Sequence, residues 1–166
     1  MRRAIFLIDG LVNGAGSIAR SLIFVLMAVI GFEAVSRYFF GAPTTWAYDL
    51  SSWVLVFYVF LGGGYALLQD GFVRVDILFQ ALPGRVQFWL DASISTVLLI
   101  CFCGSLIWYG GELALRSFAL GEVSSSGGWR GPVWPAKFAV PLGALLVLLA
   151  WISHLAKRAA LTGETE

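Results

Sequence analysis

Charged residues are scarce in this sequence of 166 residues: they make up 13% of it, against 59% hydrophobic residues. A soluble domain usually carries about 25% charged residues, because polar groups have to cover its surface. This shortage excludes an ordinary soluble protein and favours an integral membrane protein. The net charge of +1 gives no indication of electrostatic binding to nucleic acid.

Side chains that carry out chemistry are also few. His154 is the single histidine, which excludes a haem held by two imidazoles within this chain; beside Lys157 it is interpreted as part of a cationic helix end. Cys101 and Cys103 would point to nearly opposite faces of a helix and cannot bridge each other. Without a catalytic triad or a phosphate loop in the sequence, we expect no enzyme activity and no bound cofactor.

What the sequence does contain is four long apolar runs. A run of about 20 apolar residues is long enough to cross the hydrocarbon of a bilayer. The sequence therefore predicts an all-α integral membrane protein, one membrane domain over residues 1–166, with spans at about 17–40, 46–68, 88–109 and 136–155. A pair between Glu112 and Arg116 and a stop at Gly121 favour an extension of the third helix to Leu120. A threonine of the loop before Trp46 is expected to cap the second helix.

Two amphipathic segments accompany these spans. Ahead of the first span, apolar residues recur at helical spacing, which predicts a lead-in helix along the cytoplasmic face: Ile5, Ile8, Leu11, Val12, Ala15 and Ile18. Between the second and third spans, Arg74 and Asp76 lie off the apolar face of a second such segment. We expect a short interfacial helix there, at about 73–82, ended by Pro83.

The distribution of lysine and arginine predicts the orientation. With four spans, the two termini and the middle loop share one side, and cytoplasmic loops are enriched in cations. That side holds Arg2, Arg3, Arg20, Arg74, Arg85, Lys157 and Arg158. The other side holds Arg37, Arg116, Arg130 and Lys137. The cation-rich side is therefore predicted to be cytoplasmic, with both termini there.

Glu33 and Arg37 are the least expected residues, because charge near lipid is unfavourable. Their i,i+4 spacing lets them neutralise each other at the outer end of the first helix. Three roles stay open: an interfacial ion pair, a polar anchor for another helix or subunit, and a proton-binding carboxylate. Asp49 suits the positive end of the second helix, and Arg37 is expected to pair with Glu33, Asp49 or both.

Small and aromatic residues suggest contact surfaces. Gly62, Gly63 and Gly64 remove bulk from one part of the second helix, which favours close helix packing, either within this chain or against a partner. Trp129 and Trp134 occur where an aromatic belt is expected.

The stretch Arg37-Tyr38-Phe39-Phe40, followed by Trp46 and Asp49, resembles the connection between the first two helices of the small membrane subunit of TRAP transporters, the DctQ type. The family pattern there is approximately Arg-Tyr-x-Phe, a short Gly/Pro loop and Trp-x-x-Glu. Asp49 replaces the usual glutamate and keeps the charge. Val-Arg-Val-Asp at 73–76 and Pro-x-Trp-Pro at 132–135 also resemble the family. Phe72 stands where the family commonly has histidine.

This resemblance implies a tripartite secondary transporter in a bacterial inner membrane. A periplasmic binding protein (DctP-like) captures an organic anion, and a large membrane subunit (DctM-like) carries it inward with sodium. The small subunit is implied to be a scaffold that packs against the large one. The candidate interface residues are Glu33, Arg37, Trp46, Asp49, Gly62, Gly63, Gly64, Arg74, Asp76, Arg116 and Trp134. The alternative is an autonomous small antiporter with Glu33 as its proton-coupled carboxylate.

Overall fold

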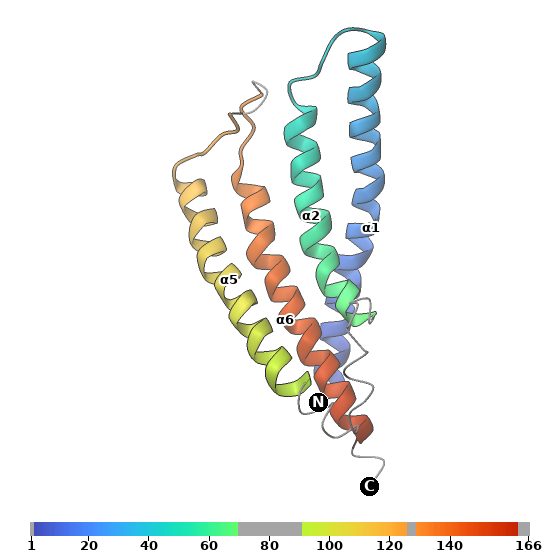
Figure 1. Cartoon of the computed structure of the whole chain (residues 1–166), viewed down its shortest axis with the longest axis vertical. Helices are drawn as coiled ribbons and strands as arrows, with labels where there is room; N and C mark the ends of the chain where they lie inside the picture. Colours follow the sequence, from blue (N-terminus) through green and yellow to red (C-terminus); the bar gives the residue numbers. More distant parts are fainter. Residues whose placement is uncertain (1, 70–90, 126–128, 163–166) are drawn as a thin grey trace.

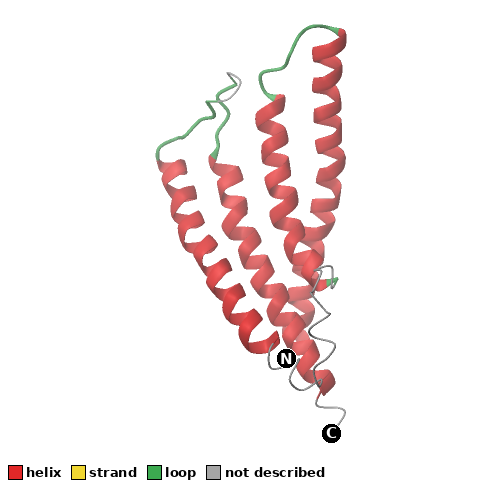
Figure 2. Cartoon of the chain, viewed as in Figure 1, coloured by secondary structure: helices red, strands yellow, loops and turns green. Residues whose placement is uncertain are grey.

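The computed structural model describes residues 2–69, 91–125 and 129–162. Its elements are α1 (Arg2–Phe39), α2 (Ala47–Leu68), a π-helical turn (Asp91–Ser95), α5 (Thr96–Ala119) and α6 (Trp134–Thr162), shown in Figures 1 and 2. Four stretches are long and apolar enough to cross a membrane: Ile5–Phe39, Ala47–Leu68, Ser93–Ala119 and Trp134–Lys157. The prediction of an all-helical protein with four such helices is confirmed. The predicted interfacial helix, with Arg74 and Asp76, lies outside the described residues.

The helices are arranged side by side in the order α1, α2, α6, α5 (Figure 1). Helix α6 packs against α2 on one side and α5 on the other, and it also touches α1. The loops α1–α2 and α5–α6 lie at one end, here called the loop end. The start of α1 and the end of α6 lie at the opposite end, here called the terminal end.

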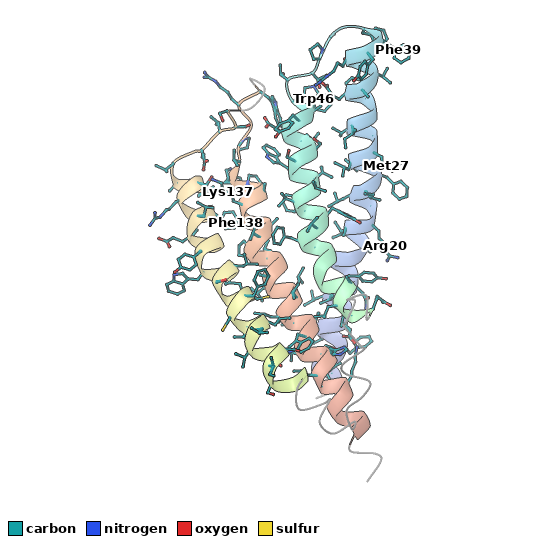
Figure 3. All side chains as sticks on the ribbon, in the orientation of Figure 1. Arg20, Met27, Phe39, Trp46, Lys137 and Phe138 are labelled. Atoms are coloured by element: carbon teal, nitrogen blue, oxygen red, sulfur yellow. The ribbon has the colours of Figure 1, made fainter. Side chains whose placement is uncertain are left out.

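The outward side chains of this layer are largely apolar. Met27 on α1 is 64% exposed and points away from the other helices (Figure 3). On α5, Phe102 and Trp108 are 65% and 74% exposed. Lipid tails are as apolar as these side chains, so a membrane protein has no hydrophobic penalty for leaving them outside.

The predicted lead-in is not a separate helix, because α1 continues without a break from Arg2 to Phe39. Its N-terminal half makes tertiary contacts with α2 and α6. Val12 is fully buried against Leu67, Ala150 and Trp151, and Gly16 leaves the space that the ring of Tyr65 fills. These contacts outweigh the low helix propensity of the glycines in this half.

Of two helix ends predicted from the sequence, the structure has one as predicted and differs at the other. Gly121 has a positive φ of 58°, and the N–H groups of Gly121 and Glu122 donate to the carbonyls of Phe118 and Ser117. This is a Schellman motif, so the predicted stop at Gly121 is confirmed. The predicted threonine cap is wrong: Trp46 occupies the N-cap without a side-chain hydrogen bond. The Thr44 hydroxyl donates to Glu33 instead.

Candidate functional site

A polar cluster joins the loop end of α1 to the α1–α2 loop. Arg37 donates to Glu33 Oε1 from Nη2 at 2.7 Å and from Nε at 3.2 Å. The Thr44 backbone N–H donates to Oε2 at 3.0 Å, and its hydroxyl donates to the same oxygen. The predicted i,i+4 pair is therefore present. Both carboxylate oxygens of Glu33 are also occupied, which satisfies a charge placed close to lipid.

Asp49 does not form the pair with Arg37 that the sequence suggested. Its side chain is 4% exposed, and its Oδ1 accepts a hydrogen bond from the Ser124 hydroxyl at 2.7 Å. Among the described residues Oδ2 has no hydrogen-bond partner. The carboxylate thus faces the α5–α6 loop rather than α1, and it fixes that loop to the first turn of α2.

Aromatic contacts reinforce the loop end. Trp46 stacks on Phe32 of α1, with ring centroids 5.8 Å apart. Trp53, one turn beyond Asp49, packs on Trp129 of the α5–α6 loop at 5.3 Å. Trp134 makes an edge contact with Phe118 of α5, also at 5.3 Å. These tryptophans therefore bridge neighbouring elements within the chain.

Ion pairs complete the loop end. The predicted pair between Arg116 and Glu112 on α5 is present at 2.5 Å, with side chains 72% and 48% exposed. Glu122 of the α5–α6 loop accepts a hydrogen bond from Lys137 of α6. That hydrogen bond lowers the pKa of the Glu122 carboxyl below its ordinary value, because it favours the charged form.

Gly63 and Gly64 of α2 face α6 inside this chain, and Gly62 faces Ala19 of α1. A Cβ atom added to Gly64 would lie 3.0 Å from the backbone oxygen of Leu146, whereas Gly62 and Gly63 have ordinary space around them. On the facing helix, a Cβ at Gly143 would lie 2.5 Å from Phe60 Cβ and 2.6 Å from its backbone oxygen. The α2–α6 crossing is therefore a close backbone contact. The small size of Gly143 could not be predicted from the sequence, because its partner Phe60 lies on another helix.

A second polar cluster, not predicted, joins α1 to α6 at the terminal end. Asp9 Oδ1 accepts a hydrogen bond from the Ser153 hydroxyl at 2.6 Å, and Asp9 Oδ2 pairs with Lys157 Nζ at 2.7 Å. The i,i+4 spacing of Ser153 and Lys157 places both on one face of α6. In the sequence, Asp9 stands out only as a polar residue within an apolar run. That feature does not predict that its partners lie on α6.

His154 and Trp151 extend the contacts of the terminal end to α5. Trp151 Nε1 donates to the Thr96 hydroxyl of α5 at 2.9 Å. His154 is 9% exposed and stacks on Trp151 at 5.7 Å. The sequence predicts His154 to be part of the cationic end of the last helix, and the structure adds that its ring packs against the aromatic side chain of Trp151. Cys103 is buried and Cys101 exposed, both as free thiols.

Taken together, the ion pairs lie near the two ends of the layer, within single helices or between neighbouring elements. Among the described residues no group of three or more His, Cys, Asp or Glu side chains could hold a metal ion. The chemistry visible in this part of the chain is hydrogen bonding and charge neutralisation. The geometry defines a multi-pass helical membrane protein.

Comparison with known proteins places this membrane protein in a family. Residues 26–161 match the DctQ component of tripartite ATP-independent periplasmic transporters, and the chain belongs to that family. A curated relative is the sialic acid TRAP transporter small permease protein SiaQ of Vibrio cholerae, 21% identical over 129 residues, which covers 76% of this chain and 70% of the relative. The resemblance read from the sequence is confirmed.

Proposed function

We propose that this chain is the small, non-transporting scaffold subunit of a sodium-coupled TRAP transporter for organic anions. It packs against the large permease subunit, which carries substrate and sodium, while a periplasmic protein delivers the substrate. The observation that carries the proposal is the placement of the described polar side chains. The ion pairs among them lie near the ends of the spans, some within one helix and some between neighbouring elements, which suits a rigid support.

The pairing of Glu33 also supports the scaffold role against the antiporter alternative. A proton-coupled carboxylate has to lose and regain its proton during transport, in exchange with the transported ion. Both oxygens of Glu33 accept hydrogen bonds from Arg37 and Thr44, and such bonds favour the charged form. Transporter sites also lie near the bilayer midplane, whereas Glu33 is less than two turns from the end of α1 at Phe39.

A reconstitution experiment tests the scaffold role. We expect the purified chain to produce no sodium- or proton-driven flux in liposomes. Co-expressed with its large permease subunit, it should purify as a complex, and deleting it should abolish uptake by the complete transporter. Ion-coupled flux through the chain alone would contradict the proposal, as would full uptake by the large subunit and the binding protein without it.

The proposed orientation places both termini in the cytoplasm of a bacterial inner membrane. It is supported by the greater number of lysine and arginine residues predicted on that side. The loop end then faces the periplasm, where the binding protein approaches. A reporter fused after Glu166 should be active only in the cytoplasm, and one inserted at Ser125 only in the periplasm; the opposite pattern would reject this orientation.

A further inference from the structure

Arg20 lies about halfway along α1 (Figure 3) and forms no ion pair with any carboxylate that the structure describes. Its side chain is exposed, and its guanidinium carbon lies 5.3 Å from the centre of the Tyr65 ring of α2. The face of an aromatic ring attracts a cation, but it supplies no negative charge that neutralises one. Within the described part of the chain, the charge of Arg20 is therefore left uncompensated.

Arg20 lies within the span rather than near one of its ends. Along α1 it is roughly 16 Å from Asp9 and roughly 20 Å from Glu33, at the helical rise per residue. The neighbouring Ala19 faces Gly62, which lies inside the span of α2. Counted without Arg20, the side of the termini still has more lysine and arginine residues than the other side, so the proposed orientation is unchanged. Arginine side chains extend to the membrane surface from positions near helix ends, whereas charges further inside pair with another group.

The described helices of this chain have no carboxylate at this depth that could be that group. Between Asp9 and Glu33, α1 contains no acidic residue. The acidic residues of α2 and α5 are Asp49 and Glu112, and both have partners near the loop end. Helix α6 contains no acidic residue. The partner of Arg20 therefore belongs to another molecule.

A second copy of this chain would not supply the missing carboxylate. In a two-fold symmetric membrane dimer, identical residues lie at the same depth. The copy would bring another Arg20, together with the same stretch of α1 that lacks acidic residues. Such a dimer would place a second uncompensated charge in the apolar layer, which is unfavourable.

The exposed face of α1 beside Arg20 suits contact with a helix rather than with lipid. A Cβ atom added to Gly10 or Gly14 would have no neighbour within 4 Å, and Ser17 and Ser21 continue this row of small exposed residues. A glycine inside a helix lowers its stability, but a row of small residues lets the backbone of a second helix approach closely. The phosphate of a lipid lies in the headgroup layer, outside the hydrocarbon, and does not need small residues beside it.

We propose that this face of α1 is the docking surface for a transmembrane helix of the large permease subunit, and that an aspartate or glutamate of that helix pairs with Arg20. The surface, here called the Arg20 face, consists of Gly10, Gly14, Ser17, Arg20 and Ser21. Charge complementarity fixes the depth of the partner helix, and the small residues let it approach. The inference rests on the proposed function, because it names the surface that meets the large subunit.

Photochemical cross-linking in the complete transporter tests where the partner helix lies. The photoreactive amino acid p-benzoylphenylalanine replaces either Ser17 on the Arg20 face or the adjacent Ile18. Ile18 is 57% exposed and points about 100° away around the helix, so it is the matched control. We expect the probe at Ser17 to cross-link the large subunit, in a helix with an acidic residue within about one turn of the labelled position. The probe at Ile18 should give severalfold less of this product.

Changes of Arg20 itself test the charge. Arg20→Leu should lower severalfold the fraction of the large subunit that co-purifies, because the acidic residue of the partner helix loses its cation. The isolated variant should be extracted from membranes at least as well as the native chain, since a charge has been removed from the span. Arg20→Lys keeps the charge and should retain most of the complex. Gly14→Leu adds bulk to the same face without a contact inside the chain, and it should also weaken the complex.

Three results would overturn the inference while leaving the scaffold role intact. Equal cross-linking of the large subunit from Ser17 and Ile18 would mean that the Arg20 face is not the docking surface. A cross-link from Ser17 to a second copy of this chain would identify the wrong partner. No protein cross-link from Ser17, with unchanged co-purification of Arg20→Leu, would mean that lipid covers this face. Failure of the native chain to co-purify with the large subunit would instead contradict the proposed function.

Discussion

The two carboxylates of α1 have nearly the same chemistry and opposite roles in the fold. Glu33 and Asp9 each pair with a cation and each accept a hydrogen bond from a hydroxyl group. The partners of Glu33 are 4 and 11 residues away, so its cluster closes a local turn. Ser153, the hydroxyl partner of Asp9, is 144 residues away. Similar chemistry thus stabilises a connection at one end and holds two distant helices together at the other.

The α2–α6 crossing lies between these two clusters. A mutation at this crossing should reduce the amount of folded protein more than any other change considered below. Gly143→Leu would force a side chain into the backbone of Phe60, and overpacking of this kind costs about 1–3 kcal/mol or more. We expect loss of most folded protein, measured as the monodisperse fraction after extraction from membranes.

Glycine positions without such contacts provide the control. A Cβ atom added to Gly31 would have no neighbour within 4 Å. A Cβ atom added to Gly62 would lie 3.7 Å from the Cβ of Ala19. Gly31→Ala and Gly62→Ala should therefore extract normally, while Gly64→Val should behave like Gly143→Leu. Normal folding of Gly143→Leu would show that the two helices are not held by close backbone contact.

Asp9→Ala tests the long-range carboxylate and should have the next largest effect. It removes the partner of both Ser153 and Lys157, which costs about 1 kcal/mol for a partly exposed charged hydrogen bond. Faster amide hydrogen exchange is expected over the first half of α1 and the last turns of α6. The exchange rate of Asp9→Asn should lie between the rates of Asp9→Ala and the native protein, because the asparagine can still accept a hydrogen bond from Ser153. Exchange that changes only next to residue 9 would reject a role in joining the helices.

Arg37→Ala tests the local carboxylate, with a smaller expected effect. Glu33 keeps its two hydrogen bonds from Thr44, so the loop stays in place while the charge near lipid loses its cation. The membrane level of the protein should fall moderately, and exchanging the two residues, Glu33→Arg with Arg37→Glu, should restore part of it. An unchanged level after Arg37→Ala would mean that the arginine only extends to the membrane surface.

The pair between Glu122 and Lys137 should give the smallest effect, visible as pH dependence. The hydrogen bond from Lys137 lowers the pKa of Glu122 from its ordinary value of 4.5. Its contribution is therefore complete above pH 4.5 and is lost as the pH falls through the lowered pKa. Proteolysis of the α5–α6 loop should increase below the ordinary pKa, and Glu122→Gln should remove this dependence. A loop equally sensitive to protease across that range would show that the pair does not hold it.

Local features of the fold could be read from the sequence, because they depend on residues close together in the chain. The four long apolar helices, the stop at Gly121 and the pairs Glu33–Arg37 and Glu112–Arg116 are of this kind. The threonine cap failed because Thr44 has a competing acceptor in Glu33. The Arg37–Asp49 pair failed because the first turn of α2 directs Asp49 towards the α5–α6 loop. Proximity along the chain did not reveal which way that side chain faces.

Hydropathy by itself determined that this protein belongs in a membrane and how many helices can cross it, because the number and length of apolar runs are properties of the chain alone. Only the tertiary structure decided that α6 is the central helix, that Gly143 as well as Gly64 must be small, and that Asp9 holds α1 against α6. Each of these depends on which helix faces which. In lipid every apolar face is equally acceptable, so hydropathy carries no information about the pairing of helices. Close packing and paired polar groups decide that pairing.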